Sequence, residues 1–131
     1  MHICLYKGPP TDLAHKIAHK AVCWFTGSKY SHCELLIGGL CYSSSARDGG
    51  VRAKAIDLTS GRWDVYPIEG DEKKALQWFI DHMGQKYDWA GIARFVIPFL
   101  PKVDSQWFCS EACGSALGLD NPHDLTPASF I

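Results

Sequence analysis

Hydrophobic and polar positions follow a short, strand-like pattern through the middle of the chain. The stretch 51–56 alternates apolar and polar residues, which is typical of a half-buried antiparallel strand. Gly38 and Gly39 separate two apolar runs and predict a two-residue hairpin turn. The same reading along the chain predicts strands over residues 2–6, 30–37, 40–45, 51–56 and 63–68.

Helical spacing flanks this strand region on both sides. After a cap at Thr11 or Asp12, apolar residues recur at helical intervals and predict an amphipathic helix. The apolar positions are Leu13, Ile17, Ala21, Trp24 and Phe25, and the solvated face carries His15, Lys16, His19 and Lys20. A second helix is expected from residue 71 or 72 to Met83 and a short third one after Cys109, each followed by a glycine. We therefore predict one α+β domain over residues 1–131, with a small antiparallel sheet packed against helices.

Composition narrows the function classes without selecting one. The net charge of -1 implies no broad electrostatic attraction of the whole chain to nucleic acid or to anionic membranes, and we expect no nucleic-acid partner. No apolar run is long enough to cross a bilayer, and the first residues do not form a signal peptide, so we expect a cytoplasmic protein with no integral membrane segment. The six cysteines are then expected to be mostly reduced thiols.

Metal binding is not expected from the spacing of the cysteines and histidines. Zinc sites usually contain close ligand pairs such as C-x-x-C, and the chain has none. His15 and His19 lie one helical turn apart and form at most half a site, and their lysine neighbours favour a solvated face. We predict no cofactor.

One strongly apolar stretch spans residues 92–100; it contains Pro98 and is followed by Pro101. It is too short to span a membrane. The stretch can be interpreted either as a segment that crosses the core or as one that lines an apolar groove.

A cysteine near the end of the chain has the setting of a nucleophile. Cys109 lies at or just before the start of the predicted third helix, where unpaired backbone N–H groups and the helix dipole favour a thiolate. The alternative is a small buried hydrophobic residue. His32, at the start of a predicted strand, is the best-placed base, and its alternative role is a structural hydrogen bond.

A third group is expected to orient the His32 imidazole. Glu34 shares the strand face of His32, while Ser43, Ser44 or Ser45 can reach across from the neighbouring strand. The sequence pattern leaves these alternatives open.

Three segments together resemble a known family. Residues 84–91 (GQKYDWAG) resemble the G-x-x-Y-x-W-x-G motif of NlpC-type papain-like cysteine hydrolases, and residues 108–111 (FCSE) resemble their D-C-S-G motif. Residues 31–38 (SHCELLIG) resemble the strand that carries the histidine in that family. Because the histidine precedes the cysteine here, the order resembles the circularly permuted branch, which includes YiiX-like proteins and relatives of lecithin–retinol acyltransferase. At Glu111 the chain departs from the standard branch, which has glycine there, whereas Cys-Ser-Glu resembles the permuted branch. The chain has only serines where the family often has its third polar residue.

The resemblance implies a permuted papain-like topology and a role for each matching residue. Cys109 would be the nucleophile and His32 the base, and Tyr87 would lie near the oxyanion together with the Cys109 backbone N–H. The implied activity is hydrolysis of an amide or ester in a peptide, a peptidoglycan peptide or an acyl lipid, through an acyl-cysteine intermediate. The alternatives are an acyltransferase that uses the same site and a binding module without turnover.

Overall fold

The computed structural model describes residues 1–8, 13–94, 97 and 99–131, with the backbone alone at 14, 15, 18, 25, 91 and 92. The elements in chain order are β1 (His2–Tyr6), α1 (Leu13–Thr26), β2 (His32–Ile37), β3 (Leu40–Ser45), β4 (Gly50–Lys54), β5 (Trp63–Pro67), α2 (Glu72–His82), β6 (Lys86–Tyr87), α3 (Trp89–Ala93), β7 (Gln106–Trp107) and α4 (Cys109–Ala116). Two 3-10 turns, Pro122–Asp124 and Pro127–Phe130, follow α4.

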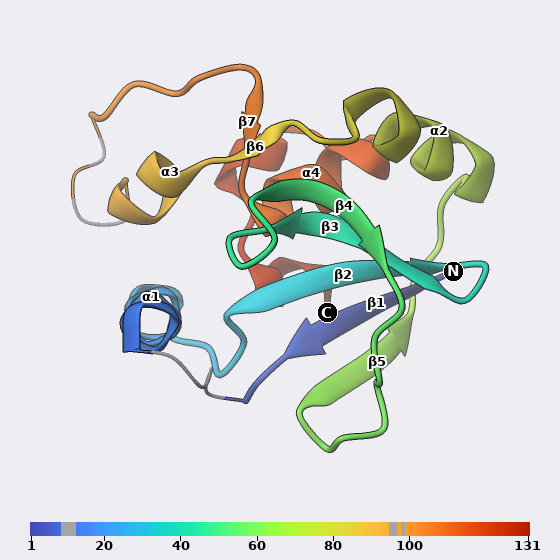
Figure 1. Cartoon of the computed structure of the whole chain (residues 1–131), viewed down its shortest axis with the longest axis horizontal. Helices are drawn as coiled ribbons and strands as arrows, with labels where there is room; N and C mark the ends of the chain where they lie inside the picture. Colours follow the sequence, from blue (N-terminus) through green and yellow to red (C-terminus); the bar gives the residue numbers. More distant parts are fainter. Residues whose placement is uncertain (9–12, 95–96, 98) are drawn as a thin grey trace.

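The strands form one twisted sheet in the order β5-β1-β2-β3-β4-β6-β7 (Figure 1). Consecutive hairpins join β2, β3 and β4, whereas β5 crosses to the other edge and pairs with β1. All the strand pairs are antiparallel except the short pair of β6 and β7. This arrangement of a mainly antiparallel sheet with helices confirms the predicted α+β class.

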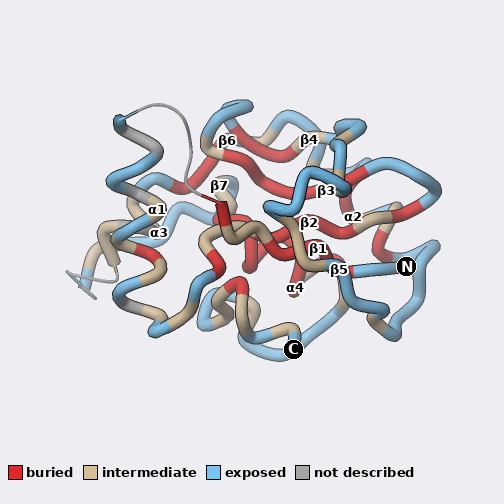
Figure 2. Tube along the Cα trace, turned by 90° about the horizontal axis from the view of Figure 1, so that it is seen from below, coloured by how far each residue is buried: buried red, intermediate tan, exposed pale blue. Residues whose placement is uncertain are grey.

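The main core lies between the sheet and α4. Alternate residues of β2 point to this side, so Cys33 and Leu35 are buried against the helix that carries Cys113. Phe79 of α2 adds a large buried side chain to the same cluster. Figure 2 shows the buried segments concentrated in the central strands and α4, with exposed loops around them. The helix that begins at Cys109 therefore rests on the strand that begins at His32.

Several local predictions hold at the level of single residues. Gly38 and Gly39 both have positive φ in the turn between β2 and β3, as a two-residue hairpin requires. The Asp71 side chain accepts a hydrogen bond from the Lys74 backbone N–H and caps α2. The predicted caps of the first helix, Thr11 and Asp12, lie outside the described residues. The short elements β6, α3 and β7 were not predicted, because two to five residues give no measurable periodicity.

The apolar stripe of α1 is largely exposed, contrary to the amphipathic interpretation. Leu13, Ile17 and Trp24 face solvent, while Val22 on the opposite side is buried. The physical reason is that α1 lies beside the end of the sheet (Figure 1), and the face that it buries is the one that carries Val22.

Of the two interpretations of residues 92–100, the one in which the segment crosses the core is wrong where the structure describes them. Ile97 is exposed and Phe99 is 86% exposed, in the segment that follows α3. Within the described residues, no helix combines the length and apolar character needed to cross a membrane.

Candidate active site

Cys109 is the first residue of α4. Phe108 before it has extended backbone, and the Glu111 carboxylate accepts a hydrogen bond from the Phe108 N–H at 3.4 Å, which ties the first turn of the helix to its cap. The strand leading into the helix is held in turn by Ser44, whose hydroxyl donates to the Trp107 carbonyl at 2.7 Å. Cys109 is fully buried, and its sulfur lies at the positive end of the helix dipole.

His32 begins β2 and interacts with both Cys109 and Glu34. Its Nε2 lies 2.7 Å from Glu34 Oε1, and the ring is also hydrogen-bonded to the Cys109 sulfur. Since Glu34 occupies Nε2, the nitrogen that remains for the thiol is Nδ1. The structure therefore brings together the predicted nucleophile, base and one of the predicted orienting groups.

The two central groups shift each other's pKa in opposite directions. Burial alone would raise the pKa of Cys109, but hydrogen bonds from Cys33 and the charge of His32 outweigh it and lower the pKa to about 5. Burial would lower the pKa of His32, but the charge and hydrogen bond of Cys109, with Glu34 beside it, raise the pKa to about 10. Between these values the pair is a thiolate and an imidazolium.

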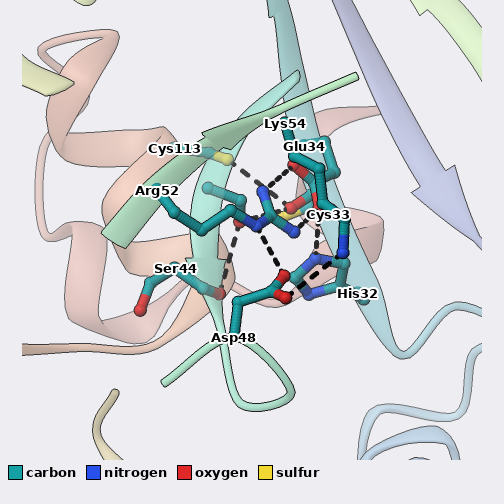
Figure 3. Close-up of polar contacts among 9 residues, drawn as sticks. His32, Cys33, Glu34, Ser44, Asp48, Arg52, Lys54 and Cys113 are labelled. Atoms are coloured by element: carbon teal, nitrogen blue, oxygen red, sulfur yellow. Dashed lines mark hydrogen bonds and ion pairs between the residues drawn. The ribbon is translucent and has the colours of Figure 1, made fainter. Parts of the chain in front are cut away.

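Glu34 is fully buried, and an arginine holds it from the far side (Figure 3). The Arg52 guanidinium donates from Nη1 to Glu34 Oε2 at 2.6 Å and from Nη2 to Oε1 at 2.5 Å. Burial would raise the pKa of Glu34, but the hydrogen bonds from Arg52 and His32 lower it. Glu34 is therefore an ionised carboxylate that holds the imidazole on one side and the guanidinium on the other.

Arg52 is itself part of a larger charged network on β4 and the preceding turn. Its Nε donates to Asp48 Oδ2 at 2.8 Å, and Lys54 Nζ lies 3.2 Å from the other oxygen of Asp48. Sequence reasoning missed Arg52. The available signal was the alternation of residues 51–56, which places Arg52 and Lys54 on one face of their strand.

The serines proposed as alternatives to Glu34 have other roles. Ser43 donates its hydroxyl hydrogen to the Cys33 carbonyl at 2.7 Å, and Ser44 binds the Trp107 carbonyl. Ser45 lines the cleft beside His32, and no hydrogen bond joins it to that ring in the part of the chain that the structure describes. Glu34 takes the position at Nε2 because its longer side chain lies on the same strand face as His32.

Tyr87 lies in β6, close to Cys109. Burial and the nearby charge of Cys109 raise the pKa of its phenol well above the usual range, so the phenol keeps its proton at neutral pH. Its ring packs against those of Trp89 and Phe108 at centroid distances of 5.2 and 5.9 Å. Tyr87 is therefore a packed, protonated phenol near Cys109.

A cleft of about 560 Å³ opens at the end of the sheet where β2 begins. His32 and Tyr87 line it, and Tyr6 and Trp63 form an aromatic wall with ring centroids 5.0 Å apart. Arg47 and Arg62 add cationic side chains to the lining. The cleft therefore reaches His32 and Tyr87, which lie near the Cys109 sulfur, and it is large enough to hold a small organic ligand.

No known family description matches the chain, and no curated protein is significantly similar to it. The site must therefore be interpreted from its own geometry.

The described residues contain no group of three or more histidine, cysteine or carboxylate side chains suited to hold a metal ion. The side chain of His15 lies outside the described part, so its pairing with His19 is not seen. His19 instead places Nδ1 2.5 Å from the Ser31 hydroxyl and Nε2 3.8 Å from the Cys23 sulfur. All six cysteines are free thiols.

Proposed function

We propose that the protein is a cysteine hydrolase that cleaves an amide or ester bond through an acyl-cysteine intermediate. One observation carries the proposal: Cys109 at the start of α4 is hydrogen-bonded to His32, whose far nitrogen is held by the buried Glu34 carboxylate. A nucleophile, a base and an orienting group in this order are the minimum set for thiol catalysis. A structural cysteine needs no such partners and would have a raised pKa.

In the proposed reaction, the Cys109 thiolate attacks the substrate carbonyl carbon. The oxyanion that forms would accept hydrogen bonds from the Cys109 backbone N–H and the Tyr87 hydroxyl. The oxyanion then re-forms the carbonyl as the C–N or C–O bond to the leaving group breaks. The His32 imidazolium gives its proton to the departing amine or alcohol, and the S–C bond of the acyl-enzyme remains. The neutral imidazole next takes a proton from water, whose oxygen attacks the thioester and releases a carboxylic acid and the thiolate.

Access to the sulfur is the main constraint on this reaction. Cys109 is fully buried, whereas His32 and Tyr87 line the cleft. A substrate carbonyl therefore has to enter between these two side chains, with a small shift of one or both. The aromatic wall of the cleft suits a substrate with an apolar or flat group next to the scissile bond. Peptides, peptidoglycan peptides and acyl lipids remain the candidate substrates.

The test uses an activated acyl ester such as p-nitrophenyl acetate. The wild-type protein should release a burst of nitrophenol and carry an acyl group on Cys109, detected by mass mapping. Cys109→Ala should remove both signals. Cys113→Ala, which changes a buried thiol one turn further along α4, should keep them and serves as the matched control. Full turnover by the Cys109→Ala protein would show that the active site lies elsewhere in the chain.

A further inference from the structure

The outward face of α1 carries three large apolar side chains. Leu13 is 74% exposed, Ile17 62% and Trp24 77%. At 3.6 residues per turn their directions fall within about 40° of one another, so they form one stripe. Scattered apolar residues are normal on a protein surface, but a contiguous stripe of this kind marks an interaction site.

The same face is cationic. Lys16 and Lys20 are exposed and lie beside the stripe, within about a further 60° around the helix. Residues 13–26 contain no aspartate or glutamate. The long lysine stems can lie along the apolar surface while their ammonium groups reach outward to an anionic partner.

The opposite face of α1 lines the cleft that contains His32 and Tyr87. Val22 is buried, and both Val22 and His19 line the cleft. Because an α-helix is about 10 Å across, whatever docks on the outward face lies about one helix diameter from the cleft lining. The stripe is therefore a separate surface that is close to the candidate active site.

We propose that the outward face of α1, formed by Leu13, Ile17 and Trp24 with Lys16 and Lys20, docks on an anionic lipid bilayer. Interfacial helices combine apolar side chains, tryptophan and lysine without acidic residues, and they lie in the plane of the headgroups. Lipid phosphates would neutralise the two ammonium groups while the apolar stripe enters the acyl boundary. The net charge of -1 limits this attraction to the helix itself.

A second copy of the chain fits this face poorly. In a two-fold dimer the same patch meets itself, so Lys16 and Lys20 of both copies would approach with no acidic residue on either helix to pair with them. Like charges at the centre of an interface cost affinity. The docking proposal rests on α1 alone and does not depend on the proposed hydrolysis, although it would bring the cleft close to a lipid-borne substrate.

The test measures binding to sedimented vesicles, made either from phosphatidylcholine alone or from equal parts of phosphatidylcholine and phosphatidylglycerol. We expect binding to the mixed vesicles and little to the neutral ones. Replacing both lysines (K16Q/K20Q) should weaken binding about 25-fold, since each lysine near an anionic surface contributes about fivefold. L13S/I17S should also weaken it, because it removes the stripe. K73Q/K74Q on α2 makes the same charge change on another exposed helix and should bind like the wild type.

Three results would overturn the proposal. The first is no binding to mixed vesicles. The second is an equal loss with K73Q/K74Q, which would mean that α1 has no special role. The third is a concentration-dependent dimer in analytical ultracentrifugation that L13S/I17S abolishes, since the face would then bind a second copy. Circular dichroism of each variant confirms that the change acts on binding and not on folding, because all the replaced side chains are exposed.

Discussion

Replacing Arg52 by glutamine is the sharpest test of how the site keeps its charges. Arg52 makes two hydrogen bonds to Glu34, which has no exposed surface, and one to Asp48. Glutamine keeps much of the length but loses the positive charge and the paired N–H donors. Glu34 would then be a buried carboxylate whose remaining charged partner is His32.

The expected loss of stability is large for a single substitution. Removing one partner of a buried ion pair typically costs about 3–5 kcal/mol, because the other charge stays buried without compensation. A domain of this size has a free energy of unfolding of about 5–15 kcal/mol, so Arg52→Gln should be measurably less stable but still mostly folded. Urea unfolding at neutral pH, followed by circular dichroism, measures the change.

The same substitution should also raise the pKa of Cys109 from its value of about 5. With Arg52 the buried groups Cys109, His32, Glu34 and Arg52 sum to zero charge, and without it they sum to minus one. A positive charge on the order of 10 Å away, at an effective dielectric of about 20, is worth on the order of one pKa unit. The midpoint of the pH dependence of Cys109 alkylation by iodoacetamide should therefore rise by about one pH unit.

Two further variants separate charge from packing. E34Q/R52Q removes both charges, so its loss of stability should be smaller than the sum of the single losses, with a coupling energy on the order of 2 kcal/mol. Asp48→Asn removes the exposed partner of Arg52 and should cost less than about 1 kcal/mol. Suppose that Arg52→Gln loses no more free energy of unfolding than Asp48→Asn and leaves the pH midpoint of Cys109 alkylation unchanged. Arg52 then does not keep Glu34 ionised.

Two other predictions concern the reaction itself. Alkylation of Cys109 should increase as the pH rises through about 5, because below its lowered pKa the thiol is protonated. Ester hydrolysis should fall as the pH rises through about 10, because His32 then loses the proton that the leaving group needs. A thiol with its ordinary pKa, near 8.5, would instead become reactive only in mildly alkaline solution. Tyr87→Phe should slow acylation by about 10²-fold while alkylation of Cys109 stays within about twofold, since only one oxyanion donor is lost; equal slowing of both would mean that Tyr87 positions the thiol instead.

The local part of the fold was predictable because short-range chemistry determines it. The turn at Gly38 and Gly39 needs positive φ at both positions, and the cap at Asp71 needs one side chain and one backbone N–H within three residues. The long apolar stripe of α1 was recognised as well, but periodicity shows only that one face of a helix is apolar. Whether another element covers that face depends on the tertiary arrangement, and here the opposite face, which carries Val22, is the buried one.

The candidate site was predictable to the extent that it depends on single elements. Cys109 at a helix start and His32 at a strand start are both local features, and the position of Glu34 two residues on places it on the same strand face as His32. Arg52 depends instead on the register of two hairpins. Leu35 lies opposite Tyr42, and Ser43 lies opposite Arg52, so the long arginine reaches across a small serine to Glu34.

That cross-strand row explains why a buried glutamate can serve as the third group of the site. A carboxylate that paired with His32 alone would compete with the Cys109 thiolate for the charge of one imidazolium. The bidentate contact with Arg52 gives Glu34 its own cation, so the charge of His32 remains available to the sulfur. Asp48 and Lys54 extend the alternation of charges to the surface. In this proposal Arg52 is a positioning residue: it affects Cys109 through the Glu34 carboxylate that it holds and through the positive charge that it adds to the buried group. Its replacement should therefore change the pH profile of the thiol as well as the stability of the fold.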